Sequence, residues 1–225
     1  MSPPTRRTGR PRSAEADRAI LGATRAALVE LGWPKLTMGD VAARAGVAKT
    51  TLYRRWANKS ELVVDAVAAL LDEEMELPDL GSLRADVEET VLRFAALLDR
   101  PEARTSLMAV VAEATHDEAL RQRIRSVIVD RQKRLVLLGR ERAQARGELP
   151  READTAAAAR SADLIFDVIA GAVVHRTLVS ADVVDELWAR DFAELLLRGF
   201  PAIVQKPAGP TQKPAGPAQK PAGSV

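Results

Sequence analysis

The sequence predicts an all-α protein of about nine helices, and three observations support this prediction. Over most of the 225 residues, apolar side chains recur at the three- and four-residue spacing of one helical face. Aromatic residues make up only 4% of the chain, although 47% of the residues are hydrophobic. No stretch shows the alternation that a half-buried strand requires. A chain of this length buries a core without disulfides and corresponds to one or two domains.

Breaking and capping residues delimit the first helices. The first helix is predicted to end at Gly32, and a capping-box pattern of Thr37 and Asp40 starts a short second helix. Gly46 ends that helix, and a third short helix is expected over residues 48–56. The remaining helices are expected after the Asn58 cap and over residues 82–98, 101–115, 117–146, 155–179 and 181–199.

Both ends of the chain lack helical periodicity. Residues 1–13 are rich in Pro, Gly and Arg and are interpreted as a flexible basic arm. From Gln205 to Gly223 the sequence repeats as QKPAGPT, QKPAGPA and QKPAG. This proline content predicts a disordered or polyproline-like tail over residues 204–225. A solvated tail with no specific role is favoured over one whose lysines touch DNA loosely.

The net charge of +2 is unevenly distributed along the chain. Residues 1–60 contain 12 Lys or Arg and 4 Asp or Glu, whereas the remaining 165 residues contain 21 and 27. A basic front followed by an acidic back indicates that the front meets a polyanion.

Composition excludes several classes of function. The chain has no cysteine, which excludes disulfides and thiolate metal sites, and two histidines are too few for a His-rich metal site. Neither a metal nor a cofactor is therefore expected. No nucleophile–base pair or glycine-rich phosphate loop is visible, so an enzyme is not expected. No apolar run reaches 18 residues and none follows the N-terminal arginines, which predicts no membrane span, no secretory signal and a cytoplasmic location.

The most informative stretch, from Leu36 to Lys59, is LTMGDVAARAGVAKTTLYRRWANK. It is interpreted as two short helices joined by a tight turn at Gly46. The second helix exposes Lys, Arg and hydroxyl side chains, and no acidic residue lies between Asp40 and Glu61. A helix with an apolar back and a cationic front fits the major groove of DNA. The alternative is an ordinary helical hairpin with a solvated basic face.

At these residues the sequence resembles the TetR family of bacterial transcriptional repressors. The resemblance covers about residues 14–65, from the helix that ends LGW to NKSEL, and YRRW is similar to a common actinobacterial-type subgroup. Two positions depart from the family pattern. Ala48 replaces a usual Ser or Thr cap, at a cost on the order of 1 kcal/mol, and Ala57 stands where Pro is frequent. The resemblance implies a dimer that places two recognition helices in successive major grooves of a near-palindromic operator.

The resemblance also implies the residues that contact DNA. The groove contacts are Lys49, Thr50, Thr51 and Arg54, the phosphate contacts are Thr37, Tyr53 and Lys59, and Arg55 serves either role. Arg10 and Arg12 on the arm are expected to reach the minor groove, although they lie outside the matching block. The domains that follow are the arm (1–13), a helix-turn-helix DNA-binding domain (14–60), a helical regulatory and dimerisation domain (61–203) and the tail (204–225).

The last two predicted helices are apolar over more than one stripe, which indicates more than one packing partner. The residues expected in a four-helix dimer interface are Ile165, Ile169, Val173, Val184, Trp188, Phe192 and Leu195. Burial inside one chain is the alternative, and the dimer is favoured because a dyadic operator needs one. The charged run over residues 141–154 is interpreted as a solvated helix end followed by a loop.

In the family, a small effector binds between the DNA-reading unit and the dimer pair. The candidate pocket residues are Phe94, Leu97, Leu98, Met108, Val111, Leu120, Ile124, Ile128, Phe166 and His175. A plain core is the alternative for the apolar residues, and a buried or interfacial histidine is the alternative for His175. An exposed capping role is expected for His116. Few polar groups line this region, so the expected effector is apolar.

The sequence therefore predicts a dimeric, DNA-binding transcriptional repressor that a small apolar effector releases from its operator. Effector binding would favour a dimer whose recognition helices are wrongly spaced for successive grooves. A constitutive repressor or an activator without a small-molecule effector is the closest alternative. A structural helical adaptor is the alternative from another class, and it would lack salt-dependent DNA binding.

Overall fold

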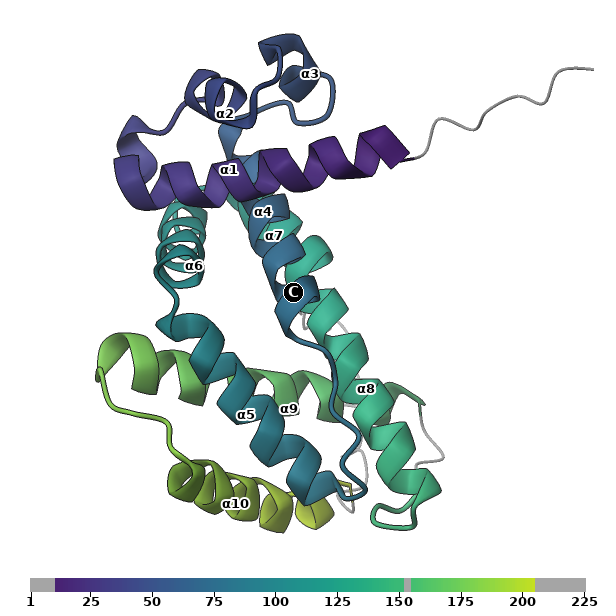
Figure 1. Cartoon of the computed structure of the whole chain (residues 1–225). Helices are drawn as coiled ribbons and strands as arrows, with labels where there is room; N and C mark the ends of the chain where they lie inside the picture. The colour runs from purple at the N-terminus through teal and green to yellow at the C-terminus, as the bar shows by residue number, and fades with distance from the viewer. Residues whose placement is uncertain (1–10, 152–154, 205–225) are drawn as a thin grey trace, which may run out of the picture.

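The computed structural model describes residues 11–151 and 155–204, and every regular element in that part of the chain is helical. The all-α prediction is confirmed. The described ranges contain nine helical rods when each π-helical segment is counted with the α-helix that it continues. Figure 1 shows a head of α1, α2 and α3 above a larger body, with α4 running from one to the other. No described helix is long and apolar enough to cross a membrane.

The head consists of α1 (Pro11–Lys35), α2 (Met38–Ala45) and α3 (Lys49–Tyr53). α1 begins inside the predicted arm, because proline is favoured in the first turn of a helix. Gly32, at φ 71° and ψ 165°, leaves helical geometry where the first helix is predicted to end, so the last residues of α1 form a separate short turn beyond this kink. α3 is shorter than the predicted helix. The side chains that form the core of the head include Ile20, Leu28, Val41, Leu52 and Trp56, all at most 5% exposed.

The helix α4 (Lys59–Glu74) belongs to both parts of the molecule. Its cap is the predicted one, since Asn58 Oδ1 accepts a hydrogen bond from the Glu61 amide at 2.9 Å. Half of its residues are buried, on more than one face, and it packs on α1 in the head and on α6, α7 and η1 in the body. A helix enclosed on several sides moves only when its neighbours move.

The body is built around a second buried core. Its elements are α5 (Leu83–Asp99), α6 (Pro101–Ala114), α7 (Glu118–Ile124), η1 (Arg125–Val129), α8 (Asp130–Ala145), α9 (Thr155–Val174), η2 (His175–Val179) and α10 (Glu186–Val204). The π-helical segments η1 and η2 each continue an α-helix without a break. α5 packs on α8, α9 and α10, and the core between these helices includes Val91, Ala143, Val173 and Ala193.

The last helix starts five residues later than predicted, at Glu186 instead of Ala181. Ala181 adopts φ 56°, a left-handed conformation that a helix excludes. The Asp185 carboxylate instead accepts a hydrogen bond from the Trp188 amide at 2.8 Å, which is the geometry of a helix N-cap. The capping residue therefore sets the start of α10, whereas the apolar pattern upstream does not.

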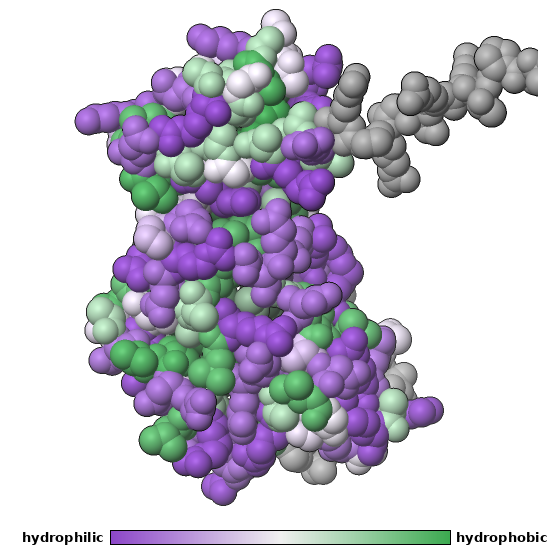
Figure 2. Space-filling model, in the orientation of Figure 1, coloured by the Kyte–Doolittle hydropathy of each residue, from purple (hydrophilic) through white to green (hydrophobic). Residues whose placement is uncertain are grey.

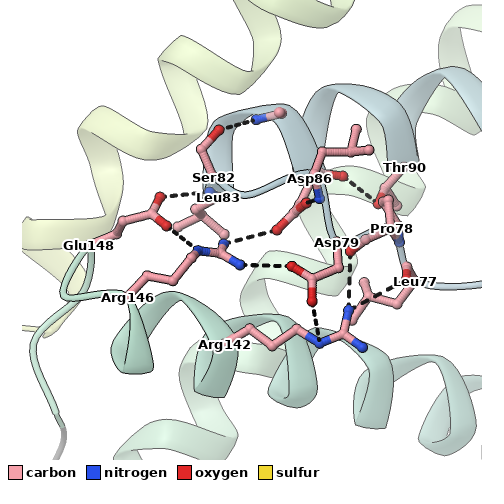
Figure 3. Close-up of polar contacts among 12 residues, drawn as sticks. Leu77, Pro78, Asp79, Ser82, Leu83, Asp86, Thr90, Arg142, Arg146 and Glu148 are labelled. Carbon is pink, nitrogen blue, oxygen red and sulfur yellow. Dashed lines mark hydrogen bonds and ion pairs between the residues drawn. The ribbon is translucent and has the colours of Figure 1, made fainter.

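The connection between α4 and α5, residues 75–82, is fastened to the C-terminal end of α8 (Figure 3). Arg142 Nη1 donates to the Pro78 carbonyl at 3.2 Å. Arg146 Nη2 donates to Asp86 Oδ2 at 2.9 Å, and Asp86 is only 4% exposed. The charged run of α8 is therefore not a solvated helix end, because its arginines hold this connection in place.

Candidate nucleic-acid interface and ligand cavity

The turn between α2 and α3 has the geometry that the sequence predicts. Thr37 Oγ1 accepts from the Asp40 amide at 3.2 Å, and Asp40 Oδ2 accepts from the Thr37 amide at 3.0 Å, which completes the capping box. The Thr37 hydroxyl also donates to Asp40, which holds the pKa of that carboxyl below its usual value. Gly46 ends α2 at φ 65°, where a side chain would be strained.

The recognition helix α3 has one buried and one exposed face. Leu52 is fully buried against the core of the head. Lys49, Thr50, Tyr53 and Arg54 are exposed, with 56% of Tyr53 accessible. The helix therefore presents two cations, one hydroxyl and one phenol to solvent, as the predicted groove and phosphate contacts require. Ala48 makes no side-chain cap, which agrees with the departure from the family pattern.

Three other predicted DNA contacts are less accessible. Thr51 is half-buried on α3. Arg55 forms an ion pair with Asp17 of α1, so its guanidinium also anchors the head. Lys59 Nζ donates to the Trp33 carbonyl at 2.8 Å and lies 4.6 Å from the centre of the Trp33 ring. The amine of Lys59 therefore stabilises the junction of α1 and α4.

The two arginines of the predicted arm fall at the edge of the structure. Arg10 lies outside the described residues, and the backbone of Arg12 is in the first turn of α1. Their predicted contact with the minor groove stays a prediction.

A cavity of about 280 Å³ lies inside the body, walled by α4, α5, α6, α7, η1, α8 and α9. Its surface is almost entirely apolar. The predicted pocket residues that line it are Phe94, Val111, Ile124, Ile128 and Phe166. A concave apolar space of roughly this size is the form that small-molecule sites take in proteins.

The structure corrects the other five pocket residues. Leu97, Leu98 and Leu120 are at most 4% exposed and pack into the cores, away from the cavity. Met108 faces outward at 42% exposure. His175 is exposed at the start of η2, with Nδ1 3.4 Å from Ser180 Oγ, so it does not face the cavity. Helical spacing alone does not distinguish a residue that faces a core from one that faces a cavity.

The polar side chains at the cavity wall differ in whether they already have hydrogen-bond or ion-pair partners. Thr90 donates to the Asp86 carbonyl at 2.7 Å, and the Asp86 carboxylate is bonded to Arg146. Arg140 is 4% exposed and already has a partner, whereas the Glu76 side chain is exposed to solvent. Gln132 is half-buried on α8, and its side-chain amide makes no hydrogen bond to any described residue. Composition did not indicate Gln132, because only the fold brings it to this wall.

The structure buries three of the seven predicted dimer residues inside the single chain. Ile165, Val173 and Phe192 are at most 9% exposed inside the single chain, and Ile165 and Ile169 line the cavity. Val184 and Trp188 are half-buried, and only Leu195 is strongly exposed, at 72%.

A different apolar set lies on the surface of α9, η2, the connection after η2, and α10. Its members, all at least 39% exposed, are Leu164, Val168, Val179, Val183, Leu187 and Leu195. Figure 2 shows hydrophobic patches at the lower left of the molecule, over η2 and the connection to α10. We call these six residues the α9–α10 face.

The comparisons with known proteins agree with this arrangement of head and body. Residues 20–66 match the family described as "Bacterial regulatory proteins, tetR family", and residues 77–196 match "Tetracyclin repressor-like, C-terminal domain". A DNA-binding transcriptional repressor TetR from Mycobacteroides abscessus is 32% identical over 184 residues, which cover 80% of this chain and 90% of the relative.

Solved structures show the same fold. A TetR family transcription regulator has a TM-score of 0.66 at 27% identity, covering 82% of this chain and 98% of its own. The regulator FadR from Bacillus subtilis, solved in complex with stearoyl-CoA, has a TM-score of 0.59 at 17% identity, covering 81% and 98%. The latter is a likeness of fold alone.

The first family match covers most of the head and the first half of α4, and the second covers the body. The matched families and these relatives are all transcriptional regulators, and none is an enzyme. The chain therefore belongs to the TetR family of DNA-binding transcriptional regulators.

Proposed function

We propose that the chain is a dimeric repressor that binds a near-palindromic operator and is released from it by a small apolar effector. The observation that carries the proposal is the two-faced helix α3. Its apolar back is fixed in the head by Leu52, while Lys49, Thr50 and Arg54 point to solvent. An exposed helix of this chemistry reads base edges and phosphates in a major groove.

The proposed dimer uses the α9–α10 face. Leu187 and Leu195 are 60% and 72% exposed on α10, and Leu164 is 46% exposed on α9. Apolar residues of two neighbouring helices pair with themselves across a twofold axis to give a four-helix interface. Such a dimer supplies the two recognition helices that a palindromic site requires.

The proposed effector occupies the apolar cavity of the body. The stearoyl-CoA complex of FadR supports a ligand with a large apolar part. An effector that binds the free dimer more tightly than the DNA-bound dimer lowers operator affinity by the ratio of the two affinities. A screen in which only polar metabolites raise the melting temperature would count against this effector class.

Selection of bound fragments from genomic DNA with the purified chain, followed by sequencing, tests the proposal. We expect a near-palindromic motif and a loss in affinity of about a thousandfold between 50 and 200 mM salt, as for about six to ten phosphate contacts. Recovery of no motif at low salt without ligand would contradict the proposed repressor.

Arg54→Ala is expected to weaken specific binding by about 1–3 kcal/mol and to relax the sequence preference at one operator position. The reason is that Arg54 is exposed at the C-cap of α3, where a guanidinium reaches guanine. Titration of the selected operator and its single-base variants measures both effects. Arg121→Ala, which removes an exposed arginine that pairs with Glu118 of its own helix α7, is the control and should leave both unchanged. Unchanged operator preference in Arg54→Ala would show that this residue does not read bases.

Gln132→Leu is expected to distinguish a neutral hydrogen-bonding ligand from a purely apolar one. The side-chain amide of Gln132 lies at the cavity wall and has no hydrogen-bond partner among the described residues. Binding of 2-naphthol should weaken by up to about tenfold, the worth of one hydrogen bond, while binding of naphthalene should not weaken. Calorimetric titration of both probes measures the difference. Equal losses for the two probes would show that Gln132 contributes only shape.

A further inference from the structure

The helix α4 carries two carboxylates that hold the neighbouring rod α7–η1–α8. Asp65 Oδ1 accepts from Arg123 Nη2 at 2.7 Å, and Asp72 pairs with Arg131. Arg123 lies in the last turn of α7 and Arg131 in the first turn of α8, so the two ion pairs flank the π-helical segment η1.

The spacing of these residues explains why η1 is π-helical. Asp65 and Asp72 are seven residues apart, so they share a face of α4 with a drift of only about 20°. Arg123 and Arg131 are eight residues apart, which in a regular α-helix would separate them by about 80°. The wider turn of η1 absorbs the one extra residue, and both arginines therefore face α4.

The other oxygen of Asp65 contacts the turn that follows the recognition helix. Asp65 Oδ2 accepts from the indole Nε1 of Trp56 at 2.8 Å, and Trp56 is 5% exposed. The Trp56 amide donates to the Leu52 carbonyl of α3 at 2.9 Å. One carboxylate thus joins Trp56, in the turn after the recognition helix, to Arg123 in the body. We call the three residues Trp56, Asp65 and Arg123 the brace.

The body end of the brace adjoins the cavity. Ile124 follows Arg123 directly, and Ile124, Ile128 and Val129 line the cavity. A ligand that pushes on these side chains acts on the wide turn itself. π-Helical turns are rare and are frequently found at functional sites.

We propose that η1 is a two-state element that couples the cavity to α3 through the brace. In the observed register, Arg123 holds Asp65 and thereby Trp56. If a cavity ligand moves the wide turn out of η1, the part of the rod that carries Arg123 rotates by about 100°, one residue of an α-helix, and Arg123 leaves Asp65. α3 then loses its brace and operator affinity falls. The inference rests on the proposed function and names the residues that regulate it.

Arg123→Gln tests the brace, with Arg121→Gln as the matched control. Both changes remove one positive charge from α7, but Arg121 pairs only with Glu118, within its own helix. Arg123→Gln is expected to lower operator affinity by about tenfold and to shift the Trp56 indole N–H resonance in NMR spectra of the full chain, whereas Arg121→Gln does neither. Trp56→Phe assigns that resonance. If either measurement on Arg123→Gln stays at the level of the control, the proposal is overturned.

Deletion of Ser126 tests the register argument without removing either arginine. Ser126 is exposed in η1, and its deletion makes Arg123 and Arg131 seven residues apart, so that a regular α-helix satisfies both ion pairs. The deletion is expected to keep the melting temperature, the Trp56 resonance and the operator affinity near those of the parent chain. Deletion of Arg134, an exposed residue beyond both ion pairs, rotates the rest of α8 and should lower the melting temperature strongly. Equal damage from the two deletions would overturn the role of η1.

The two proposals fail in different ways. If the parent chain selects no DNA motif, the proposed function fails, and the Trp56 resonance alone decides whether the brace exists. If the parent chain binds its operator and Arg123→Gln matches Arg121→Gln, only the brace is wrong.

Discussion

Leu195→Glu is expected to convert the proposed dimer into folded monomers and to lower operator affinity by at least about a hundredfold. Leu195 is 72% exposed on α10, so the charge costs little within one chain. Across a twofold interface the substituted residue occurs once in each protomer. Forming the interface would therefore remove two glutamate carboxylates from water. Two linked recognition helices gain about 10²–10⁴ in affinity over one, and the monomer loses that gain. Sedimentation velocity and operator titration measure the two effects.

Leu80→Glu is the matched control for this change, because Leu80 is 57% exposed on the α4–α5 connection, away from the α9–α10 face. Leu80→Glu should leave both the sedimentation mass of the protein and its operator affinity unchanged. A Leu195→Glu chain that sediments as a dimer and binds the operator would show that the interface lies elsewhere.

Arg146→Leu is expected to destabilise the chain by about 3 kcal/mol, because it leaves the Asp86 carboxylate buried without its cation. Asp86 is 4% exposed, and its other oxygen accepts from the Leu80 amide at 2.7 Å. The melting temperature of a chain of this size should fall by about 6–12 °C, as thermal unfolding would measure. Adding Asp86→Asn should restore part of the loss, since the amide is neutral and still accepts from Leu80.

The control for this prediction is the exposed ion pair of Arg104 and Asp99, whose side chains are 51% and 73% exposed at 3.7 Å. Arg104→Leu should cost less than about 1 kcal/mol, because water screens the pair. Equal losses of stability in the two variants would mean that the Asp86 carboxylate in Figure 3 does not depend on its ion pair with Arg146.

Local signals were sufficient for the head. The capping box of Thr37 and Asp40 and the left-handed Gly46 are short-range features, and each lies where the sequence predicts it. The exposed residues of α3 follow from helical period alone, once Leu52 is assigned to the core. The partners of Arg55 and Lys59 were not predictable in this way. Asp17 and Trp33 belong to α1, which meets α3 and α4 only in the folded chain.

In the body, the helical period of the apolar residues did not distinguish core surfaces from cavity walls or exposed faces. Leu98 and Phe94 both recur at helical spacing on α5, yet the first packs into a core and the second lines the cavity. Val173 and Leu195 are equally apolar in sequence, but α5 covers one and leaves the other exposed. Which apolar stripe meets which neighbour depends on how the helices are packed, and that is a long-range property.

The sequence by itself determined the all-α class, the ends of most helices, the head and its recognition helix, because these depend on residues within a few turns of each other. Only the tertiary structure decided the cavity wall, the α9–α10 face and the brace. Asp65 lies far along the chain from Arg123. The seven-residue spacing of the two aspartates on α4 meets the eight-residue spacing of the two arginines only because α4 and η1 pack side by side. Charges and apolar side chains acquire partners through packing, which no local pattern encodes.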